Sequence, residues 1–148
     1  HRWNDMLSGH TVRGMFITAL LGRIIPSQAQ VELASAGHCS PFRIQPSGKA
    51  IEERQPGSPP LGIFPQLTSK TSTLRLEPGE WLVSFTDGLS ESFDPADLLL
   101  DREGVARLLS RPFARATEVV DVLNQGEIDH RQGVDPQDDL TVLVFGFQ

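Results

Sequence analysis

Apolar and polar positions along the chain form patterns that predict strands first and helices later. Met15 to Ile25 is a largely apolar segment with several β-branched residues, which indicates a buried strand. Ala29 to Ala36 alternates as a second strand, and Pro26 to Gln28 between them is typical of a turn. These segments predict an antiparallel hairpin, followed by a short strand at Phe42 to Ile44.

Two more strands are expected in the middle of the chain, at Thr71 to Leu76 and Trp81 to Phe85. The turn Glu77 to Glu80 joins them, with Pro and Gly in its central positions as a type II turn prefers. From Asp94 to Arg131 apolar residues recur at helical spacing in two groups, which Pro112 separates. We therefore expect two helices in this range.

The last apolar segment, Leu140 to Phe147, is continuous and of strand character. Its lack of alternation predicts burial on both faces, in the middle of a layered structure. The residues before His10 are expected to be the last turns of a helix. Strands, then two helices, then a final strand predict an α+β fold in which helices flank the sheets.

Composition narrows the class of protein. The chain has 148 residues, enough for one domain with a real core, and its 39% apolar and 22% charged residues are ordinary for a soluble protein. A net charge of −6 argues against binding nucleic acid or an anionic membrane surface. No apolar stretch is long enough to span a membrane, and the N-terminus shows no signal pattern.

Cys39 is the only cysteine, so an internal disulfide and a thiolate zinc site are excluded. A single cysteine favours a reducing compartment, and we expect a cytoplasmic protein. A lone cysteine is also a weak candidate nucleophile without a base beside it, so Cys39 is interpreted as a small buried apolar residue.

Two acidic clusters lie at the ends of predicted core strands. Asp87, in Thr-Asp-Gly, directly follows the strand Trp81 to Phe85, and the segment Asp135 to Asp139 directly precedes the strand that begins at Leu140. If these strands are antiparallel neighbours, Asp87 and Asp138 approach each other at one rim of the sheet. Clustered carboxylates repel, and a divalent cation relieves that repulsion; oxygen ligands without cysteine suit magnesium or manganese.

A simpler interpretation exists for each cluster. Asp-Gly is a common turn dipeptide, and paired aspartates before a strand can be a solvated loop or a guard at a sheet edge. On the residues alone, a metal site and two solvated turns remain alternatives.

Five short motifs, in order, resemble those of a known family. Leu76 to Ser92 (LEPGEWLVSFTDGLSES) resembles the hallmark of the bacterial stage II sporulation E-type phosphatases, which are metal-dependent relatives of the type 2C protein phosphatases. Four other stretches resemble the family's remaining motifs: Met15 to Ala19 (MFITA), Ser35 to Pro41 (SAGHCSP), Pro60 to Ile63 (PLGI) and Asp138 to Thr141 (DDLT).

The resemblance implies a fold, a reaction and a partner. The fold is a partial α-β-β-α sandwich of antiparallel sheets flanked by helices, in which residues 1–148 form the C-terminal portion of a single phosphatase domain. The reaction is hydrolysis of phosphoserine or phosphothreonine by a metal-activated water, without a phospho-enzyme. The substrate implied is a phosphorylated regulatory protein of the anti-sigma-antagonist type in bacterial partner switching, with a sensor domain possible upstream.

The resemblance also assigns roles to residues. Asp87 and Asp138 are the expected ligands of Mn²⁺ or Mg²⁺, with two ions in the intact domain. Asp139 is expected either to lie just outside the ligands or to contribute weakly to the ion, and to hold the loop by hydrogen bonds. His38 invites a role as general acid for the leaving alkoxide. A structural role in a turn beside Gly37 is favoured instead, because a lone histidine is usually structural.

The front of the family pattern has no counterpart here. An early Gly-Asp-x-x-Asp strand and an Asp-x-x-Gly-His-Gly helix start supply further metal ligands in the family, and nothing in His1 to Gly14 matches them. The chain is therefore expected to be a fragment of a phosphatase domain, weakly active alone. The alternative is a catalytically incomplete or inactive module that binds a regulatory protein. Missing strands would leave a sheet exposed, so self-association is expected.

Overall fold

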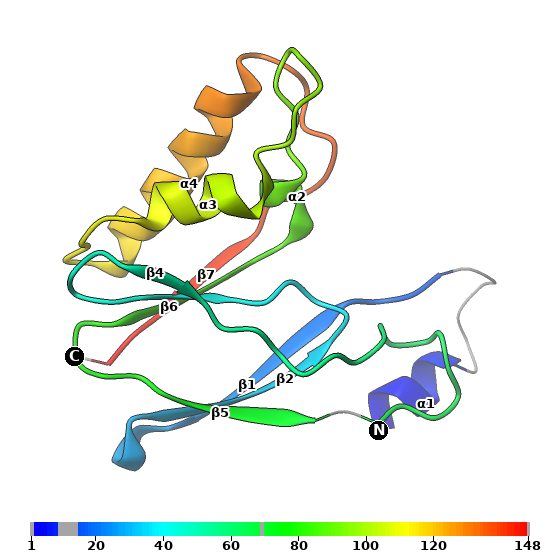
Figure 1. The fold of residues 1–148 in the computed structure, drawn as a ribbon. Helices are drawn as coiled ribbons and strands as arrows, with labels where there is room; N and C mark the ends of the chain where they lie inside the picture. Colours follow the sequence, from blue (N-terminus) through cyan, green and yellow to red (C-terminus); the bar gives the residue numbers. More distant parts are fainter. Residues whose placement is uncertain (1, 9–14, 69, 148) are drawn as a thin grey trace. The chain divides into compact units, whose positions relative to one another are not determined.

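The structure, a computed structural model, describes residues 2–8, 15–68 and 70–147 (Figure 1). Its contacts divide the chain into two compact units. The first unit comprises His1–Ser40 and Arg54–Arg75, and the second comprises Pro41–Glu53 and Leu76–Gln148. Each unit combines antiparallel strands with helices, which confirms the α+β class. No helix in the described ranges is long and apolar enough to cross a bilayer.

The first unit holds a three-stranded antiparallel sheet of order β1-β2-β5. Its elements are α1 (Arg2–Ser8), β1 (Ala19–Ile25), the 3-10 turn η1 (Pro26–Gln28), β2 (Gln30–Ala36) and β5 (Thr71–Arg75). The predicted hairpin is confirmed, because β1 and β2 pair in register from Ala19 with Ala36 to Ile25 with Gln30. Ala29 closes the turn with a left-handed φ of 49° and donates its N–H to the Pro26 carbonyl at 3.2 Å.

The predicted beginning of the first strand is wrong, because β1 starts at Ala19 rather than at Met15. Upstream of β1, Ile17 forms an isolated bridge with Leu61 through two backbone hydrogen bonds of 3.0 and 2.8 Å. The side chains of Met15 and Phe16 are exposed. The apolar run therefore continues beyond the part of the chain that pairs with β2.

Asn4 fixes α1 to the loop that follows Leu61. This side chain is buried; its Nδ2 donates to the carbonyls of Phe64 at 2.9 Å and Pro65 at 3.2 Å, and its Oδ1 accepts from the Gly62 N–H at 3.1 Å. All the polar atoms of the amide are thus used, which a buried amide requires. The expected helical end before His10 is confirmed over the residues of α1.

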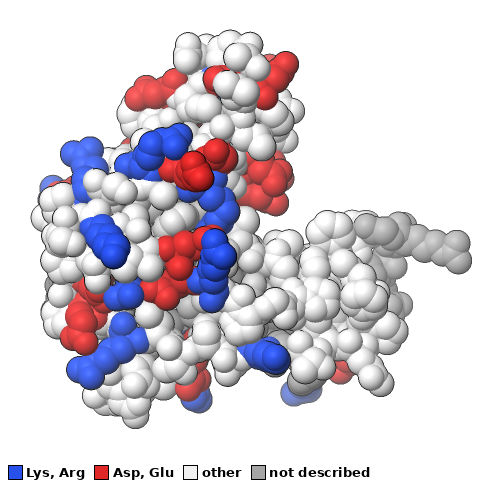
Figure 2. All heavy atoms as spheres, viewed as in Figure 1, with Lys and Arg blue, Asp and Glu red and all other residues white. Residues whose placement is uncertain are grey.

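The surface around α1 is largely apolar. Trp3 and Met6 are exposed, and few charged side chains appear over α1 in Figure 2. A cavity of about 340 Å³ is lined by Trp3, by Leu21 of β1 and by Leu67. β1 also lies at an edge of its sheet, which leaves one side of its backbone without a strand partner among the described residues.

The second unit holds a four-stranded antiparallel sheet of order β4-β3-β6-β7 with helices on one face (Figure 1). Its elements are β3 (Phe42–Ile44), β4 (Ala50–Glu52), β6 (Trp81–Phe85), α2 (Asp87–Ser90), α3 (Asp101–Leu109), α4 (Ala116–Arg131) and β7 (Val142–Phe145). The helical-spacing residues Val105 and Leu109 of α3 and Val119 of α4 pack against Val83 of β6, and all four are fully buried. The two predicted helices are confirmed.

The predicted place of the last strand is wrong. β7 is an edge strand, and its Leu143 side chain is 66% exposed, so the segment is not buried on both faces. Its pairing with β6 is the expected one, antiparallel, from Leu82 with Phe145 to Phe85 with Val142. The end of β6 and the beginning of β7 therefore meet at one rim of this sheet.

Candidate metal centre

Asp87 lies where strand β6 gives way to helix α2. Thr86, extended at φ −80° and ψ 159°, links Phe85 to the helix, and Asp87 is the first helical residue. The turn is fixed from below, because Leu89 is fully buried and donates its N–H to the Thr86 carbonyl at 3.1 Å. Asp87 itself is exposed. Asp87 is therefore an exposed residue at the rim of the sheet, and the buried Leu89 fixes the backbone around it.

Asp138 and Asp139 lie in the loop that precedes β7, next to Thr86 at the end of β6. The Thr86 N–H donates to the Thr141 carbonyl at 3.1 Å, which continues the β6–β7 ladder one residue past the strands. The Thr86 hydroxyl donates to the Asp139 carbonyl at 3.0 Å and accepts from the Thr141 N–H at 2.9 Å. One side chain thus joins the residue before Asp87 to both sides of Leu140.

Gly88 allows the two segments to come close. A Cβ added at this position would lie 2.6 Å from the carbonyl oxygen of Asp139 and 3.2 Å from that of Asp138. Real Cβ atoms essentially never approach backbone oxygen so closely, so the residue after Asp87 must be glycine if the loop keeps its place. The Gly of the Thr-Asp-Gly motif is therefore explained by the loop on top of it.

The expected approach of Asp87 and Asp138 therefore holds at the level of the backbone. Both residues are exposed, and both lie at the rim where β6 ends and β7 begins. The Asp138 carboxylate accepts from the Asp139 N–H at 2.7 Å, which turns one of its oxygens back onto its own loop. Asp139 takes part through its backbone N–H and carbonyl, and the role expected of its side chain stays a prediction.

The donors at this rim suit a hard divalent cation in kind. Carboxylate oxygens are ligands that Mg²⁺ and Mn²⁺ prefer. Each ion binds about six oxygen atoms, and several of these usually belong to water molecules. Over residues 2–8, 15–68 and 70–147 no group of three or more His, Cys, Asp or Glu side chains is arranged to hold an ion. Asp87 and Asp138 would therefore supply part of a coordination shell that needs further oxygen donors.

The other two candidate residues belong to the first unit. Nδ1 of His38 lies 3.3 Å from the Thr18 hydroxyl, and the His38 carbonyl accepts from the Ser35 hydroxyl at 3.2 Å. Gly37 beside it has a φ of +66° and packs against Pro60, as expected of a tight turn. The structural role of His38 stays a prediction. Cys39 is half-buried.

Thr86 and Gly88 are site residues to which the sequence analysis gave no role in holding the loop. The signal was present, since both flank Asp87 in the Thr-Asp-Gly motif. Asp87-Gly88 was interpreted as a turn, whereas the structure places these two residues at the beginning of helix α2.

Comparison with known proteins identifies the family and the fold of the chain. The family model of the stage II sporulation protein E (SpoIIE) matches residues 1–148. Protein IcfG of Synechocystis sp. (strain ATCC 27184 / PCC 6803 / Kazusa) is 29% identical over 142 residues, which are 95% of this chain and 22% of IcfG. The chain therefore spans about a fifth of that relative.

Solved structures share the fold. The phosphatase domain of the cell fate determinant SpoIIE from Bacillus subtilis (Mn presoaked) superposes with a TM-score of 0.72 at 19% identity, over 97% of this chain and 62% of that one. The SiaA-PP2C domain of Pseudomonas aeruginosa gives a TM-score of 0.76 at 19% identity, over 88% and 52%. The fold is that of the PP2C-type phosphatase domains. This chain belongs to the SpoIIE family.

Proposed function

We propose that residues 1–148 are the C-terminal portion of a metal-dependent protein serine/threonine phosphatase domain, in which Asp87 and Asp138 are metal ligands. The observation that carries the proposal lies at the rim of the sheet in the second unit. There Thr86 and Gly88, on either side of Asp87, contact the loop that contains Asp138. Such fastening is expected where two carboxylates must keep a fixed separation, and a solvated turn has no need of it.

The ion would be Mn²⁺ or Mg²⁺, with two ions in the intact domain. When bound, such ions supply an acidified water as nucleophile and neutralise charge on the phosphoryl group. Asp87 and Asp138 would orient that ion at an accessible rim, and Asp139 would hold the loop through its backbone. Cys39 has no part in this reaction, and His38 keeps its turn through Thr18.

The substrate we propose is a phosphorylated regulatory protein in bacterial signalling, of the anti-sigma-antagonist type. Support comes from family membership and from the SpoIIE neighbour, which is described as a cell fate determinant. The net charge of −6 favours a protein partner over nucleic acid or an anionic membrane. The single cysteine supports a cytoplasmic location, and a sensor domain upstream is compatible with the 22% of IcfG that this chain spans.

A second candidate function is a binding module that has the fold without the turnover. The observation in its favour is that the described residues hold no group of three potential metal-ligating side chains. In that case Asp87 and Asp138 would be solvated residues of a docking surface for the regulatory protein.

Asparagine substitutions in the full-length protein separate the two candidates. We expect Asp87→Asn and Asp138→Asn each to weaken Mn²⁺ binding in calorimetric titration and to abolish hydrolysis of a phosphoserine peptide, with binding of the partner retained. Asp121→Asn is the matched control, because Asp121 is an exposed carboxylate on α4. Unchanged Mn²⁺ binding and unchanged turnover in both variants would support the module instead.

The isolated chain provides a further test of completeness. If the remaining ligands lie in other segments of the domain, the 148-residue chain should bind Mn²⁺ weakly and hydrolyse the phosphopeptide slowly. Mn²⁺-dependent activity equal to that of an intact phosphatase domain would show that Asp87 and Asp138 suffice with water.

A further inference from the structure

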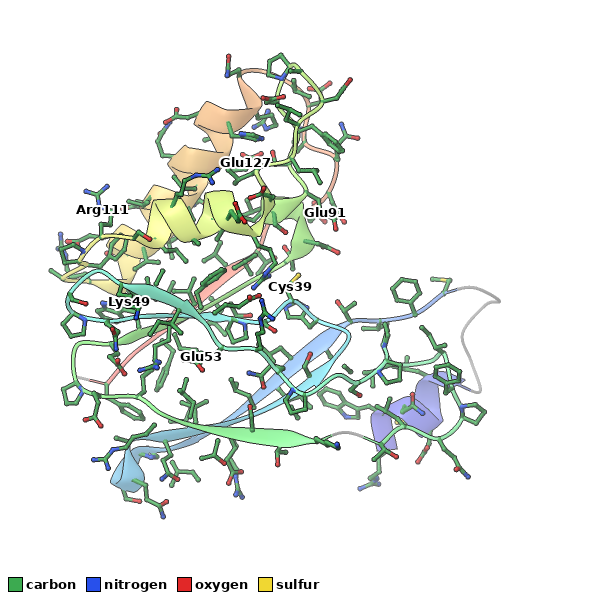
Figure 3. The ribbon with its side chains drawn as sticks, viewed as in Figure 1. Cys39, Lys49, Glu53, Glu91, Arg111 and Glu127 are labelled. Carbon is green, nitrogen blue, oxygen red and sulfur yellow. The ribbon has the colours of Figure 1, made fainter. Side chains whose placement is uncertain are left out.

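Helix α4 carries a buried carboxylate that neither the fold nor the proposed ligands explain. Glu127 is 8% exposed, and one of its oxygens, Oε1, accepts from the Ser92 hydroxyl at 2.9 Å and from the Arg131 Nε at 2.8 Å. Glu127 is labelled on α4 in Figure 3. A buried charge is retained only when it is paired and hydrogen-bonded, and Ser92 and Arg131 meet that requirement.

The pair reaches beyond the helix. Arg131, the last residue of α4, also donates from its guanidinium to the Val134 carbonyl. The chain turns sharply between Arg131 and Val134, because Gln132 and Gly133 both have positive φ, 46° and 93°. Arg131 therefore fastens the first residues of the loop that leads to Asp138.

Ser92 belongs to the segment that bears Asp87. It follows α2 by two residues, it is buried, and its carbonyl accepts from the Leu100 N–H at 2.9 Å. The other end of the same short segment is Thr86, which holds the far end of the Asp138 loop. The loop from 132 to 141 is thus attached at both ends to residues 86–92.

We propose that Glu127 is a positioning residue for the metal centre: through Ser92 and Arg131 it holds the start of the Asp138 loop on the Asp87 segment, so that ion affinity depends on it. This inference rests on the proposed function. Two attachments restrict the loop more than the Thr86 contacts alone, and restriction of ligand-bearing loops is what gives residues outside the coordination shell their effect on affinity.

A second buried glutamate in the same unit provides a matched control. Glu80 is 4% exposed, pairs with Arg43 at 2.8 Å and accepts from the Glu77 N–H at 3.0 Å. It precedes β6, whereas Asp87 follows β6. Loss of either carboxylate charge should destabilise the unit, because in each case a partly buried arginine loses its ion-pair partner. Of the two glutamates, only Glu127 is connected to the Asp138 loop.

The experiment compares Glu127→Gln with Glu80→Gln in two measurements well below the Tm of each variant. Amide hydrogen exchange reports on the loop without any metal, and calorimetric titration with Mn²⁺ reports on affinity. We expect Glu127→Gln to speed exchange at 134–141 at least tenfold while β6 stays protected, and to weaken Mn²⁺ binding about tenfold. Glu80→Gln should lower the Tm and change neither.

Ser92→Ala provides a second route should Glu127→Gln fold poorly. It removes one hydrogen bond to Glu127 and leaves the Arg131 pair, so we expect the same two changes at smaller size. Faster exchange with unchanged Mn²⁺ affinity in both variants would overturn the inference, as would unchanged loop exchange.

The failure of the inference is distinct from that of the proposed function. If Asp87→Asn abolishes Mn²⁺ binding and Glu127→Gln leaves it intact, the metal centre stands and the role of Glu127 is wrong. If the parent protein binds no Mn²⁺, the proposed function fails, and the effect of Glu127 on ion affinity fails with it.

Discussion

Thr86 and Thr141 are joined by two hydrogen bonds, one from the Thr86 N–H to the Thr141 carbonyl at 3.1 Å and one from the Thr141 N–H to the Thr86 hydroxyl at 2.9 Å. The first extends the strand ladder, and the second replaces its next step by a side chain. Because the same hydroxyl donates to the Asp139 carbonyl, it gives a partner to a backbone group on each side of Leu140, where the chain leaves the sheet.

Removal of the Thr86 hydroxyl should loosen the Asp138 loop. Thr86→Val keeps the shape and the β-branch but leaves the Thr141 N–H and the Asp139 carbonyl without this partner, so we expect a loss of about 1 kcal/mol in the free energy of unfolding. Mn²⁺ affinity should fall in the same variant. Thr86→Ser keeps the hydroxyl and should retain affinity; urea unfolding and calorimetry measure both. Equal affinity in the Val and Ser variants would show that the hydroxyl does not matter to the centre.

Gly88 should not tolerate even a methyl group. In Gly88→Ala the new Cβ would meet the Asp139 carbonyl at 2.6 Å, so the loop must move, at about 1 to 2 kcal/mol even though alanine favours a helix. We expect weaker Mn²⁺ binding in a protein that still folds. Gly57→Ala is the control, because a Cβ there meets nothing within 4 Å. Parent-like binding by Gly88→Ala would indicate that the loop position is not needed.

The sequence marks the two strand ends that meet at this rim, whereas the pairing of β6 with β7 was only a condition of the prediction. Trp81 to Phe85 is a short apolar run that stops at an acidic turn, and Leu140 is the first apolar residue after another. Antiparallel neighbours then bring Asp87 and Asp138 to one rim. Local patterns were sufficient to place the strand ends, because polarity changes abruptly there, but the pairing itself comes from the structure.

Other features were beyond local patterns. A uniform apolar run cannot tell an edge strand from a central one, so the exposure of Leu143 was missed. The contact between Ser92 and Glu127 joins residues 35 positions apart, and it depends on how α4 lies over the sheet. Only the spacing of Glu127 and Arg131, four residues apart on one helix, was visible in the sequence.

The exposed edge of the first unit should drive self-association. Leu21 and Ile24 are exposed on β1, the outer strand of its sheet, and an apolar edge strand is a template for pairing with a second copy. We expect the double variant Leu21→Lys with Ile24→Lys to shift the chain toward monomer in multi-angle light scattering. Leu98→Lys, at an exposed leucine outside any strand, should not. A parent chain that is monomeric at high concentration would contradict this prediction.

Asp94 should make the second unit sensitive to acid. Its carboxylate accepts from the N–H groups of Leu98 at 2.9 Å and Ala96 at 2.8 Å, and these bonds, Leu98 first, with a smaller contribution from His130, hold the pKa of Asp94 below its ordinary value. In the unfolded chain the pKa returns to about 3.9. Between the two values the unfolded state binds the extra proton, so the stabilisation is complete above the unfolded pKa and is lost as pH falls through the folded one.

We expect a carboxyl NMR titration of Asp94 with its midpoint below that of an unstructured aspartate. Asp94→Asn, which keeps the acceptor oxygen without the charge, should flatten the dependence of unfolding free energy on pH in that window. A normal midpoint together with an unchanged slope would show that the loop does not hold the charge.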